Sequence, residues 1–217
     1  MDGSRVSFFE LAALPAIGET LLDPRPAFAF SADGGRCLFA NAAAVAALDA
    51  TDLDDLLSRR FTDLNPIKAQ MARMSRILPT EQSRLEVLRF GGGVSSITLT
   101  AACRRLNLAE DERVVLAVAA GGSSTDSLRT RAERLASALA GHQAQVAILD
   151  DDGEIVAAAA PDSAPLDAAD LRELAIAAED ARGRPISERE RRHGETIHAR
   201  AVRFSTLAAL CRELECQ

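Results

Sequence analysis

The stretch FAFSADGGRCLFAN, from Phe28 to Asn41, predicts the fold of the first half of this chain. Two apolar runs flank a polar segment that contains Asp33 and Gly34, and an Asp-Gly pair between apolar runs is a strong local signal for a β-hairpin. Asn41 then opens an alanine-rich run, and its side chain can cap the helix that such a run favours. The stretch therefore predicts two antiparallel strands that lead directly into a helix.

The same pattern returns 118 residues later, in VAILDDDGEIVAAA from Val146 to Ala159. Aligned without gaps, both stretches consist of an apolar strand, an acidic turn and a second apolar strand, and Gly153 falls on Gly35. Self-similarity at a fixed spacing indicates that one structural unit is repeated. We therefore expect a second unit over residues 143–217.

The acidic turn of the second stretch has an alternative interpretation. Asp150, Asp152 and Gly153 match the D-x-D-G opening of haloacid-dehalogenase-type phosphatases, in which one Asp attacks phosphorus and the other acts on the leaving group with Mg²⁺. That chemistry also needs a lysine and a later acidic pair, but the 64 residues after Gly153 contain no lysine and no βαβ alternation. A solvated hairpin turn is therefore favoured, and an Mg-dependent aspartyl phosphatase is the weakest of the functions considered.

Between the two hairpins the sequence continues as helices and then strands. TDLDDLLSRRFTDL offers Thr51 or Asp52 as a helix cap, and IKAQMARMSRIL is a helix bounded by Pro66 and Pro79. RLEVLRF, SSITLTAACRRL and RVVLAVAA then follow a period of two, which predicts an antiparallel meander with one buried face. These elements assign residues 26–121 to one domain.

Two helical segments flank that domain. Residues 1–25 form an N-terminal helical segment that breaks at Pro15. Residues 122–142 form a linker helix whose apolar residues follow an a/d spacing over about two heptads, a pattern that favours pairing with a second copy of the chain. The positions of this expected dimer seam are Leu128, Ala132, Leu135 and Leu139.

The second unit, residues 143–217, is expected to be smaller than the first. After its hairpin, Asp167 can cap a helix in ADLRELAIAAEDAR, and TIHARAVRF predicts one further strand before the terminal run STLAALCRELECQ. The unit is therefore expected to lack its last strands, either as a degenerate copy or through truncation at Gln217.

Composition narrows the classes of function. The chain carries 25 Lys and Arg residues against 32 Asp and Glu residues, and its formal net charge is −7. No basic block stands out, so nucleic-acid binding lacks its electrostatic basis. No apolar run reaches the roughly 18–20 residues of a membrane span, and the N-terminus lacks a signal-peptide pattern. Four cysteines without metal-ligand spacing are typical of a reducing compartment, so a cytoplasmic location is expected.

The order of elements over residues 26–121 resembles that of a PAS domain. A hairpin, a capped helix, short helical turns, a long helix and a meander follow one another in FAFSADGGRCLFAN, NPIKAQMARMSRIL, RLEVLRF, SSITLTAACRRL and RVVLAVAA. The resemblance implies an α+β fold: a five-stranded antiparallel sheet in the strand order 2-1-5-4-3, with helices on one face. It implies a linker helix and a second, incomplete PAS-like unit after it.

Tandem PAS-like units in an acidic chain resemble the sensory region of soluble alphaproteobacterial cell-cycle sensor histidine kinases, the PleC/DivJ homologue group. This resemblance implies a non-catalytic sensory and dimerisation region of a two-component phosphorelay, which relays a signal or a partner-binding event to a C-terminal kinase core. The implied partners are a second copy of the chain and a response regulator or another signalling protein. The alternative is a stand-alone PAS sensor or adaptor that binds a small molecule.

No histidine has the setting of a phospho-acceptor. A kinase core needs a His beside an acidic residue, followed by a glycine-rich ATP site, and His142, His193 and His198 lack that context. We therefore expect no catalytic residue and no enzymatic activity in this chain.

No cofactor is expected either. Flavin photosensors of the PAS class carry a reactive Cys in the sequence Asn-Cys-Arg-Phe, which neither Cys37 nor Cys103 matches. Residues 1–141 contain no His that could bind haem iron, and the helical spacing of Met71 and Met74 is more typical of core packing. The sequence predicts no metal site.

The small-molecule alternative places a ligand cavity inside the first PAS-like unit. Ordinary core packing is the competing interpretation of the same apolar residues. The expected cavity walls are Phe30, Phe39, Leu56, Phe61, Met71, Met74 and Leu85.

Overall fold

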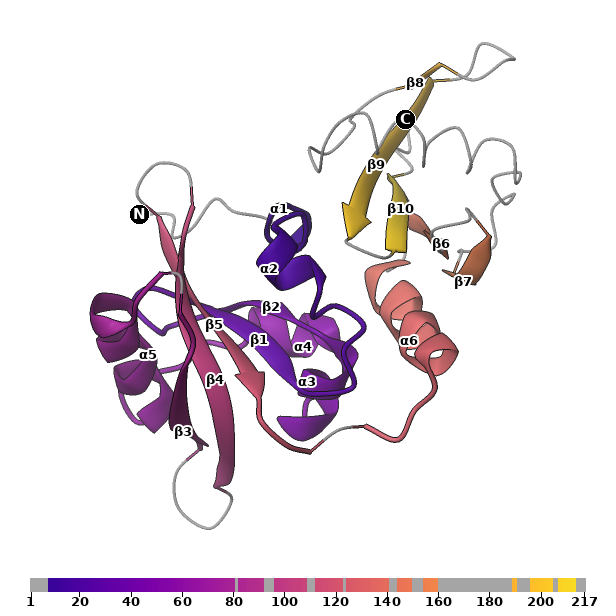
Figure 1. Cartoon of the computed structure of the whole chain (residues 1–217). Helices are drawn as coiled ribbons and strands as arrows, with labels where there is room; N and C mark the ends of the chain where they lie inside the picture. The colour runs from indigo at the N-terminus through magenta and orange to yellow at the C-terminus, as the bar shows by residue number, and fades with distance from the viewer. Residues whose placement is uncertain are drawn as a thin grey trace. The chain divides into compact units, whose positions relative to one another are not determined.

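The chain consists of two compact units in the computed structural model (Figure 1). Met1–Phe8 and Thr20–Thr125 form the first unit, and Phe9–Glu19 and Asp126–Gln217 form the second. The described residues are 8–80, 82–91, 96–108, 112–122, 124–140, 144–149, 154–159, 189–190, 196–204 and 207–213.

The first unit is built on a five-stranded antiparallel sheet in the order β2-β1-β5-β4-β3. This is the strand order that the resemblance to PAS domains implies, so the α+β, PAS-like fold is confirmed. The strands are β1 (Ala27–Ser31), β2 (Cys37–Ala40), β3 (Arg84–Phe90), β4 (Ile97–Asn107) and β5 (Arg113–Ala119).

Three helices pack on one face of this sheet (Figure 1). The short helices α3 (Ala42–Ala47) and α4 (Leu53–Ser58) contact β1 and β2, and α5 (Pro66–Ile77) contacts β1, β3 and β5. Asn41 and Asp52 cap α3 and α4, as their positions in the sequence predict, because each side chain accepts a hydrogen bond from an N–H of the first turn.

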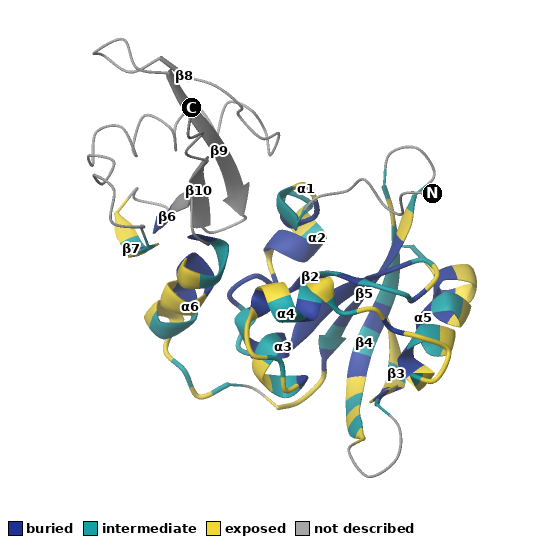
Figure 2. Ribbon diagram, turned by 180° about the vertical axis from the view of Figure 1, so that it is seen from behind, coloured by how far each residue is buried: buried dark blue, intermediate teal, exposed yellow. Residues whose placement is uncertain are grey.

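Strand register determines which side chains face the helices. Phe28 pairs with Ala117, which pairs in turn with Cys103, so these side chains share the inner, helix-covered face. Ala29 pairs with Phe39 and both therefore lie on the outer face. The central strands β1 and β5 are buried along most of their length, whereas β3 alternates exposed and buried positions (Figure 2).

The turn of the first hairpin is the surface against which α5 packs. Gly34 has a φ of 71°, and a Cβ atom there would lie 2.3 Å from the carbonyl oxygen of Lys68 in α5. The hydroxyl of Ser75, also in α5, donates to the carbonyl oxygen of Ala32 at 2.7 Å. The Asp-Gly turn therefore sets the distance between the helix and the sheet, because only glycine leaves room for this approach.

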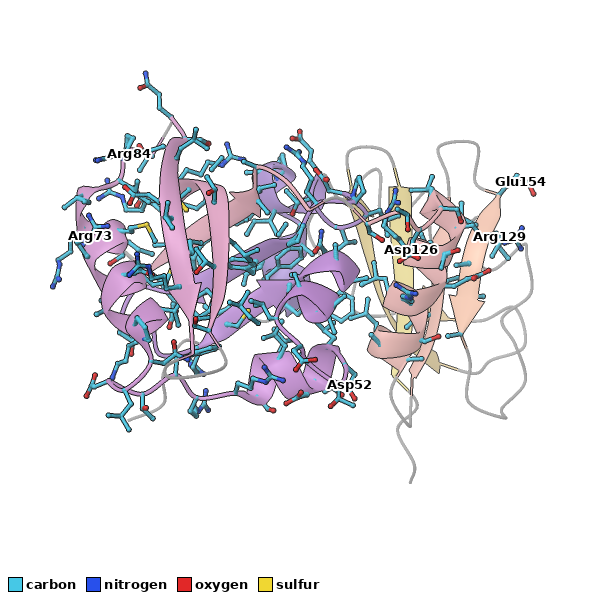
Figure 3. The ribbon with its side chains drawn as sticks, turned by 90° about the horizontal axis from the view of Figure 1, so that it is seen from below. Asp52, Arg73, Arg84, Asp126, Arg129 and Glu154 are labelled. Carbon is cyan, nitrogen blue, oxygen red and sulfur yellow. The ribbon has the colours of Figure 1, made fainter. Side chains whose placement is uncertain are left out.

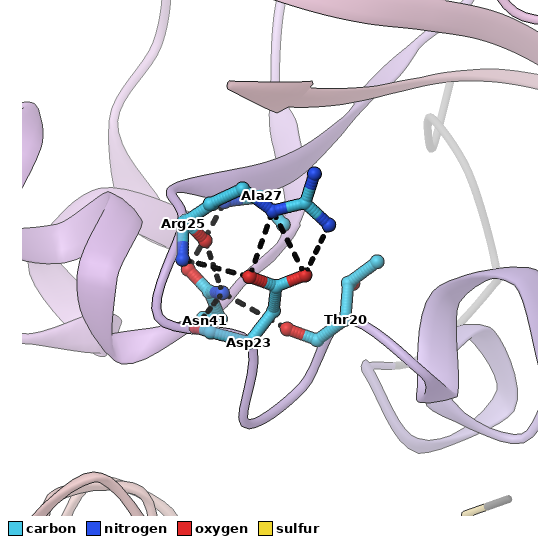
Figure 4. Close-up of polar contacts among 5 residues, drawn as sticks. All are labelled: Thr20, Asp23, Arg25, Ala27 and Asn41. Atoms are coloured by element: carbon cyan, nitrogen blue, oxygen red, sulfur yellow. Dashed lines mark hydrogen bonds and ion pairs between the residues drawn. The ribbon is translucent and has the colours of Figure 1, made fainter. Parts of the chain in front are cut away.

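A buried side-chain amide joins the incoming chain to the sheet (Figure 4). Asn41 is 1% exposed, and its Nδ2 lies 2.9–3.1 Å from the carbonyl oxygens of Thr20, Asp23 and Arg25. Its Oδ1 accepts from the N–H groups of two residues, Ala27 at 3.1 Å and Ala44 at 2.9 Å. One side chain therefore fixes the approach to β1, the start of β1 and the start of α3.

The second unit repeats the sheet of the first. Its five strands pair antiparallel in the order β7-β6-β10-β9-β8, and α6 (Leu128–Ala140) packs on β6 and β7. The strands are β6 (Ala144–Leu149), β7 (Ile155–Ala159), β8 (Arg189–Glu190), β9 (Thr196–Phe204) and β10 (Leu207–Glu213).

The expectation that this unit lacks its last strands is wrong. The strand predicted in TIHARAVRF is present as β9, and LAALCRE forms β10, which pairs with β6 along one edge and with β9 along the other. LAALCRE contains no β-branched residue, and its residue types favour a helix. Pairing on both edges overrides that local preference. The unit is reduced at β8, which has only two residues.

The two hairpins share a bulge at the same repeat position. Leu38 is the extra residue of β2 and Val156 that of β7, 118 positions apart as the sequence alignment predicts. The first strands align differently, because six residues separate Phe30 from its partner Cys37 and only five separate Leu149 from its partner. The structural equivalent of Phe30 is therefore Leu149, one position beyond the residue that the ungapped alignment gives.

The remaining predicted elements fall at the two ends of the chain. The N-terminal segment contains α1 (Phe8–Ala12) and α2 (Pro15–Gly18), with Pro15 as the first residue of α2. The helix predicted in ADLRELAIAAEDAR and the acidic turn Asp150–Gly153 lie outside the described residues. The antiparallel pairing of β6 with β7 confirms the second hairpin.

Replacement of Asn41 tests the role of the buried amide. We expect Asn41→Ala to lower the free energy of unfolding of the first unit by about 3 kcal/mol, because buried carbonyl and N–H groups lose their partners together. Native-state hydrogen exchange of the β1 and β5 amides measures this change in the first unit alone. Asn107→Ala is the matched control, since Asn107 is exposed at the end of β4, and it should change stability by less than about 0.5 kcal/mol. Equal effects of the two variants would contradict this role.

Candidate ligand pocket

A cavity of about 600 Å³ opens in the first unit between the turn after α3, the end of α4 and the adjoining ends of β3 and β4. It combines an apolar floor with a polar rim. The residues that line it are Leu48, Asp49, Leu56, Arg59, Arg60, Phe61, Asn65, Phe90, Gly91, Ser96 and Ile97.

Aromatic rings form one side of the floor. Phe30 meets Phe61 edge-on with ring centroids 5.0 Å apart, and it lies 6.2 Å from Phe90. Phe90 in turn meets Phe28 edge-on at 5.3 Å. Such pairs contribute roughly 0.5–1.5 kcal/mol each beyond the area that they bury, so these rings hold a fixed arrangement. The floor is therefore formed in advance of any ligand.

Arg59 fastens the polar rim. Its guanidinium donates to the Asp55 carboxylate at 2.7 and 3.2 Å and to the carbonyl oxygens of Leu48 and Asp49 at 3.1 and 3.0 Å. These contacts hold a turn in which Asp49 has a φ of 49°. This value lies in the left-handed region of backbone conformation, which residues other than glycine rarely adopt. The hydrogen bond from Arg59 lowers the pKa of Asp55 to about 2, and the reciprocal contact raises the pKa of Arg59. The guanidinium of Arg59 therefore donates its hydrogen bonds to partners within the protein.

Asn65 connects the start of α5 to the end of β3. Its Oδ1 accepts from the N–H of Ile67 and from the N–H of Gly91, both at 3.2 Å. One turn further along α5, the amide of Gln70 donates to the carbonyl oxygen of Val87 and accepts from the N–H of Arg89. These bonds hold β3 against α5 and thereby fix the wall of the cavity.

Arg60 is the second guanidinium of the rim. It is exposed, and its backbone forms an isolated antiparallel bridge with Arg36, beside a hydrogen bond from the N–H of Phe61 to the carbonyl oxygen of Gly35 at 3.0 Å. The bridge joins the end of the first hairpin turn to the segment after α4. It places Arg36 opposite Arg60, of which Arg60 lines the cavity.

A separate ion-pair cluster lies on α5 and β3, away from the cavity lining. Glu86 pairs with Arg73 of α5 and with Arg84 of its own strand, each at 3.2 Å, and the two arginines lie near one another at one end of the unit (Figure 3). The Glu86 side chain is 14% exposed and both arginines are largely exposed. The cluster joins α5 to the edge strand β3, and none of its three charged residues lines the cavity.

The structure brings part of the predicted cavity together. Leu56 and Phe61 line the pocket, and Phe30 supports it from below through its ring contacts. Met71 and Met74 are fully buried on α5 and are not part of the lining.

Two of the predicted wall residues are wrong. Phe39 lies on the outer face of the sheet, opposite to Phe30, where its ring stacks on Phe8 at 5.2 Å. Leu85 is 66% exposed on the outer face of β3. Both are apolar residues in strands, and their faces depend on register and on the bulge at Leu38, which the sequence does not display.

Sequence reasoning missed most of the rim and one side of the floor. Phe90 and Ile97 are register partners at the ends of β3 and β4, and both line the cavity. Arg59 and Arg60 were not predicted as part of the site, although the sequence shows two adjacent arginines directly before an apolar residue, Phe61. That dipeptide was the available signal for a charged rim.

The expected dimer seam is divided between buried and accessible positions. Ala132 and Leu135 are buried, on a helix that packs on β6 and β7, whereas Leu128 is 49% exposed and Leu139 is half-buried. Half of the seam is therefore already occupied within the chain. Dimerisation stays a prediction.

The described residues include two free thiols in the first unit. The described part of the chain contains no cluster of three or more His, Cys, Asp or Glu side chains that could hold a metal ion. Cys37 and Cys103 are free thiols buried in the first unit, and burial raises the pKa of each to about 12. His142 and His193 lie outside the described residues. Among the helices that the structure describes, none is long and apolar enough to cross a membrane.

No protein family model and no curated protein matches the sequence. Among solved structures, a PAS domain of an HTR-like protein from Haloarcula marismortui is 20% identical over 48% of this chain and 92% of that chain, with a TM-score of 0.34. A structure described as the extracellular domain of a histidine kinase, rpHK1S-Z16, is 16% identical over 93% and 75% of the two chains, with a TM-score of 0.27. An uncharacterised protein from Mycobacterium tuberculosis is 11% identical over 89% and 64%, with a TM-score of 0.24. At these scores, the PAS-like fold rests on the strand order and helix placement of the chain itself.

The two buried thiols give a direct test of the first unit. With Cys211→Ser and Cys216→Ser in place, we expect no reaction of the folded protein with a thiol reagent at a pH of about 8, because a raised pKa keeps both thiols neutral and burial blocks access. Absorbance of the released thiolate measures the reaction. In urea, Cys37 and Cys103 should both react. Rapid labelling of either one in the folded protein would contradict the buried assignment.

Proposed function

We propose that this chain is a sensory region in which the first PAS-like unit binds a small molecule. The observation that carries the proposal is the cavity of about 600 Å³ with an apolar floor and a polar rim. Its size lies in the range of ligand sites, and the combination of apolar lining with a few placed polar groups is typical of them.

The elements around the cavity supply a means of response. A ligand there would contact the turn that Arg59 fastens, the segment after α4, and the ends of β3 and β4 at Ile97. Binding would favour the arrangement of these elements that it contacts best, and this differential affinity is what a sensor needs. We propose that the chain acts by binding and relay, without catalysis.

The wider context is proposed from the sequence resemblance alone. The chain would relay the binding event, as a cytoplasmic homodimer, to a histidine-kinase core that exchanges phosphoryl groups with a response regulator. The coding sequence after Gln217 tests this context. We expect an open frame that reaches an H-[DE]-x-[KR]-[ST]-P helix and a glycine-rich ATP site. A stop codon in that position would instead favour a free-standing sensor or adaptor.

Filling the cavity tests the ligand-binding proposal. Ile97 faces the pocket, whereas the next residue, Thr98, is exposed on the outer face of β4. We expect native mass spectrometry of gently purified protein to show a bound small molecule in the wild type and in Thr98→Trp, but not in Ile97→Trp, because only the latter indole occupies the cavity. The two variants add the same bulk, so Thr98→Trp controls for it. An adduct that persists in Ile97→Trp, or a wild type that binds nothing from a small-molecule library, would contradict the proposal.

A further inference from the structure

We infer that the pocket takes an amphipathic organic anion, whose apolar body lies on the aromatic floor and whose carboxylate or phosphate group lies between Arg36 and Arg60. The inference rests on the proposed ligand-binding function and adds the chemical class of the ligand. Its basis is the arrangement of charge at the rim of the cavity.

The two arginines are held close together by the backbone. The hydrogen bond from the N–H of Phe61 to the carbonyl oxygen of Gly35 makes Arg36 and Arg60 a non-hydrogen-bonded pair of an antiparallel bridge. Directly opposed residues of this kind project their side chains to the same side, and their Cβ atoms lie about 4.5–5.5 Å apart. Arg60 lines the cavity, and the bridge places the start of the Arg36 side chain beside that of Arg60.

Like charges in such a pair repel each other. Among the residues that the structure describes, no carboxylate forms an ion pair with the guanidinium of Arg36 or of Arg60. Opposed like charges destabilise a strand pair. An anion placed between the two guanidinium groups reduces their repulsion and accepts charge-assisted hydrogen bonds from both.

The nearby carboxylates already have other partners. Asp55 is bound by Arg59, and Asp63 pairs with Lys68 at 2.9 Å. Asp33 accepts from the hydroxyl of Ser31 and from the N–H of Gly35, which lowers its pKa. Asp33 keeps its negative charge, because both of these partners are neutral, and it lies at this edge together with the two opposed arginines, in a chain whose net charge is −7.

Asp49 is the carboxylate that lines the pocket itself, and it lies near Arg59, whose guanidinium is already paired with Asp55. The proximity of Asp49 contributes to the raised pKa of Arg59, which shows that the two charges interact. The lining therefore carries Asp49, Arg59 and Arg60, and in the described part of the chain only Arg59 of these three forms an ion pair, with Asp55. An anionic group gains a partner there, whereas a neutral polar group does not.

The floor of the cavity decides between an inorganic and an organic anion. Leu48, Leu56, Phe61, Phe90 and Ile97 present an apolar surface in the same cavity of about 600 Å³ that Arg60 lines. An inorganic ion would leave that surface wet, whereas an alkyl or aromatic body covers it and gains hydrophobic stabilisation. The pocket therefore fits a molecule with one anionic end and one apolar end.

Calorimetric titration of the full chain with matched probes tests this inference. Octanoate and octyl phosphate carry the two anionic groups, and octanol has the same apolar body without charge. We expect both anions to bind about tenfold or more tightly than octanol, and their affinity to fall with added salt. Arg60→Gln and Arg36→Gln should each remove most of that advantage and leave the affinity for octanol unchanged. A preference for octyl phosphate over octanoate would identify the head group as a phosphate, and the reverse preference would identify a carboxylate.

Arg89→Gln is the control variant, because Arg89 is exposed on the outer face of β3 and the substitution removes the same charge. It should bind all three probes as the wild type does. Equal binding of octanoate, octyl phosphate and octanol, or anion binding that is unchanged in Arg60→Gln and Arg36→Gln, would overturn the anion assignment while the ligand pocket stands. Failure of all three probes to bind would count against the pocket itself.

Discussion

The buried amide of Asn41 is the contact on which the architecture of the first unit depends. Three carbonyl oxygens of the approach segment, the N–H of Ala27 and the N–H of Ala44 all converge on this one side chain. Two of these groups also bond within the backbone, because the carbonyl oxygen of Thr20 accepts from the N–H of Asp23 and the N–H of Ala44 also donates to the carbonyl oxygen of Asn41. For the others, the Asn41 side chain supplies the partner that a folded chain needs for its backbone polar groups. The corresponding position of the second unit is Ala159, whose side chain has no hydrogen-bonding atom. The second sheet therefore has the same strand order without this fastening.

From that fixed point the fold builds the pocket in steps. Asn41 sets β1 and β2, and the close approach at Gly34 then sets the position of α5 against their turn. The start of α5 carries Asn65, whose side-chain Oδ1 accepts from the N–H of Gly91 at the end of β3. The aromatic floor closes the far side, because Phe90 belongs to the same strand end. The cavity is thus the space left where three fastened elements meet, and its shape follows from the polar contacts between them.

The sequence predicted what is local and missed what depends on register. The Asp-Gly hairpins, the caps at Asn41 and Asp52, and the strand order are carried by short signals or by the order of elements. The misplaced wall residues, Phe39 and Leu85, are apolar residues whose face is set by pairing across the sheet. The strand β10 was missed because its composition favours a helix, and its two neighbours in the sheet lie far away in the sequence.

Arg59 and Arg60 are adjacent in the sequence and both line the cavity, but they have different roles. Arg59 follows Asp55 by four positions, so the end of α4 brings the two side chains together on one face, and the ion pair consumes its guanidinium. Arg60 lies one residue beyond, where the chain has left the helix and forms a bridge with the first hairpin. It therefore faces another arginine in place of an acid. Arg59 therefore holds the turn after α3 through its ion pair and hydrogen bonds, whereas Arg60 forms no ion pair among the described residues. The end of α4 between the two residues determines this difference.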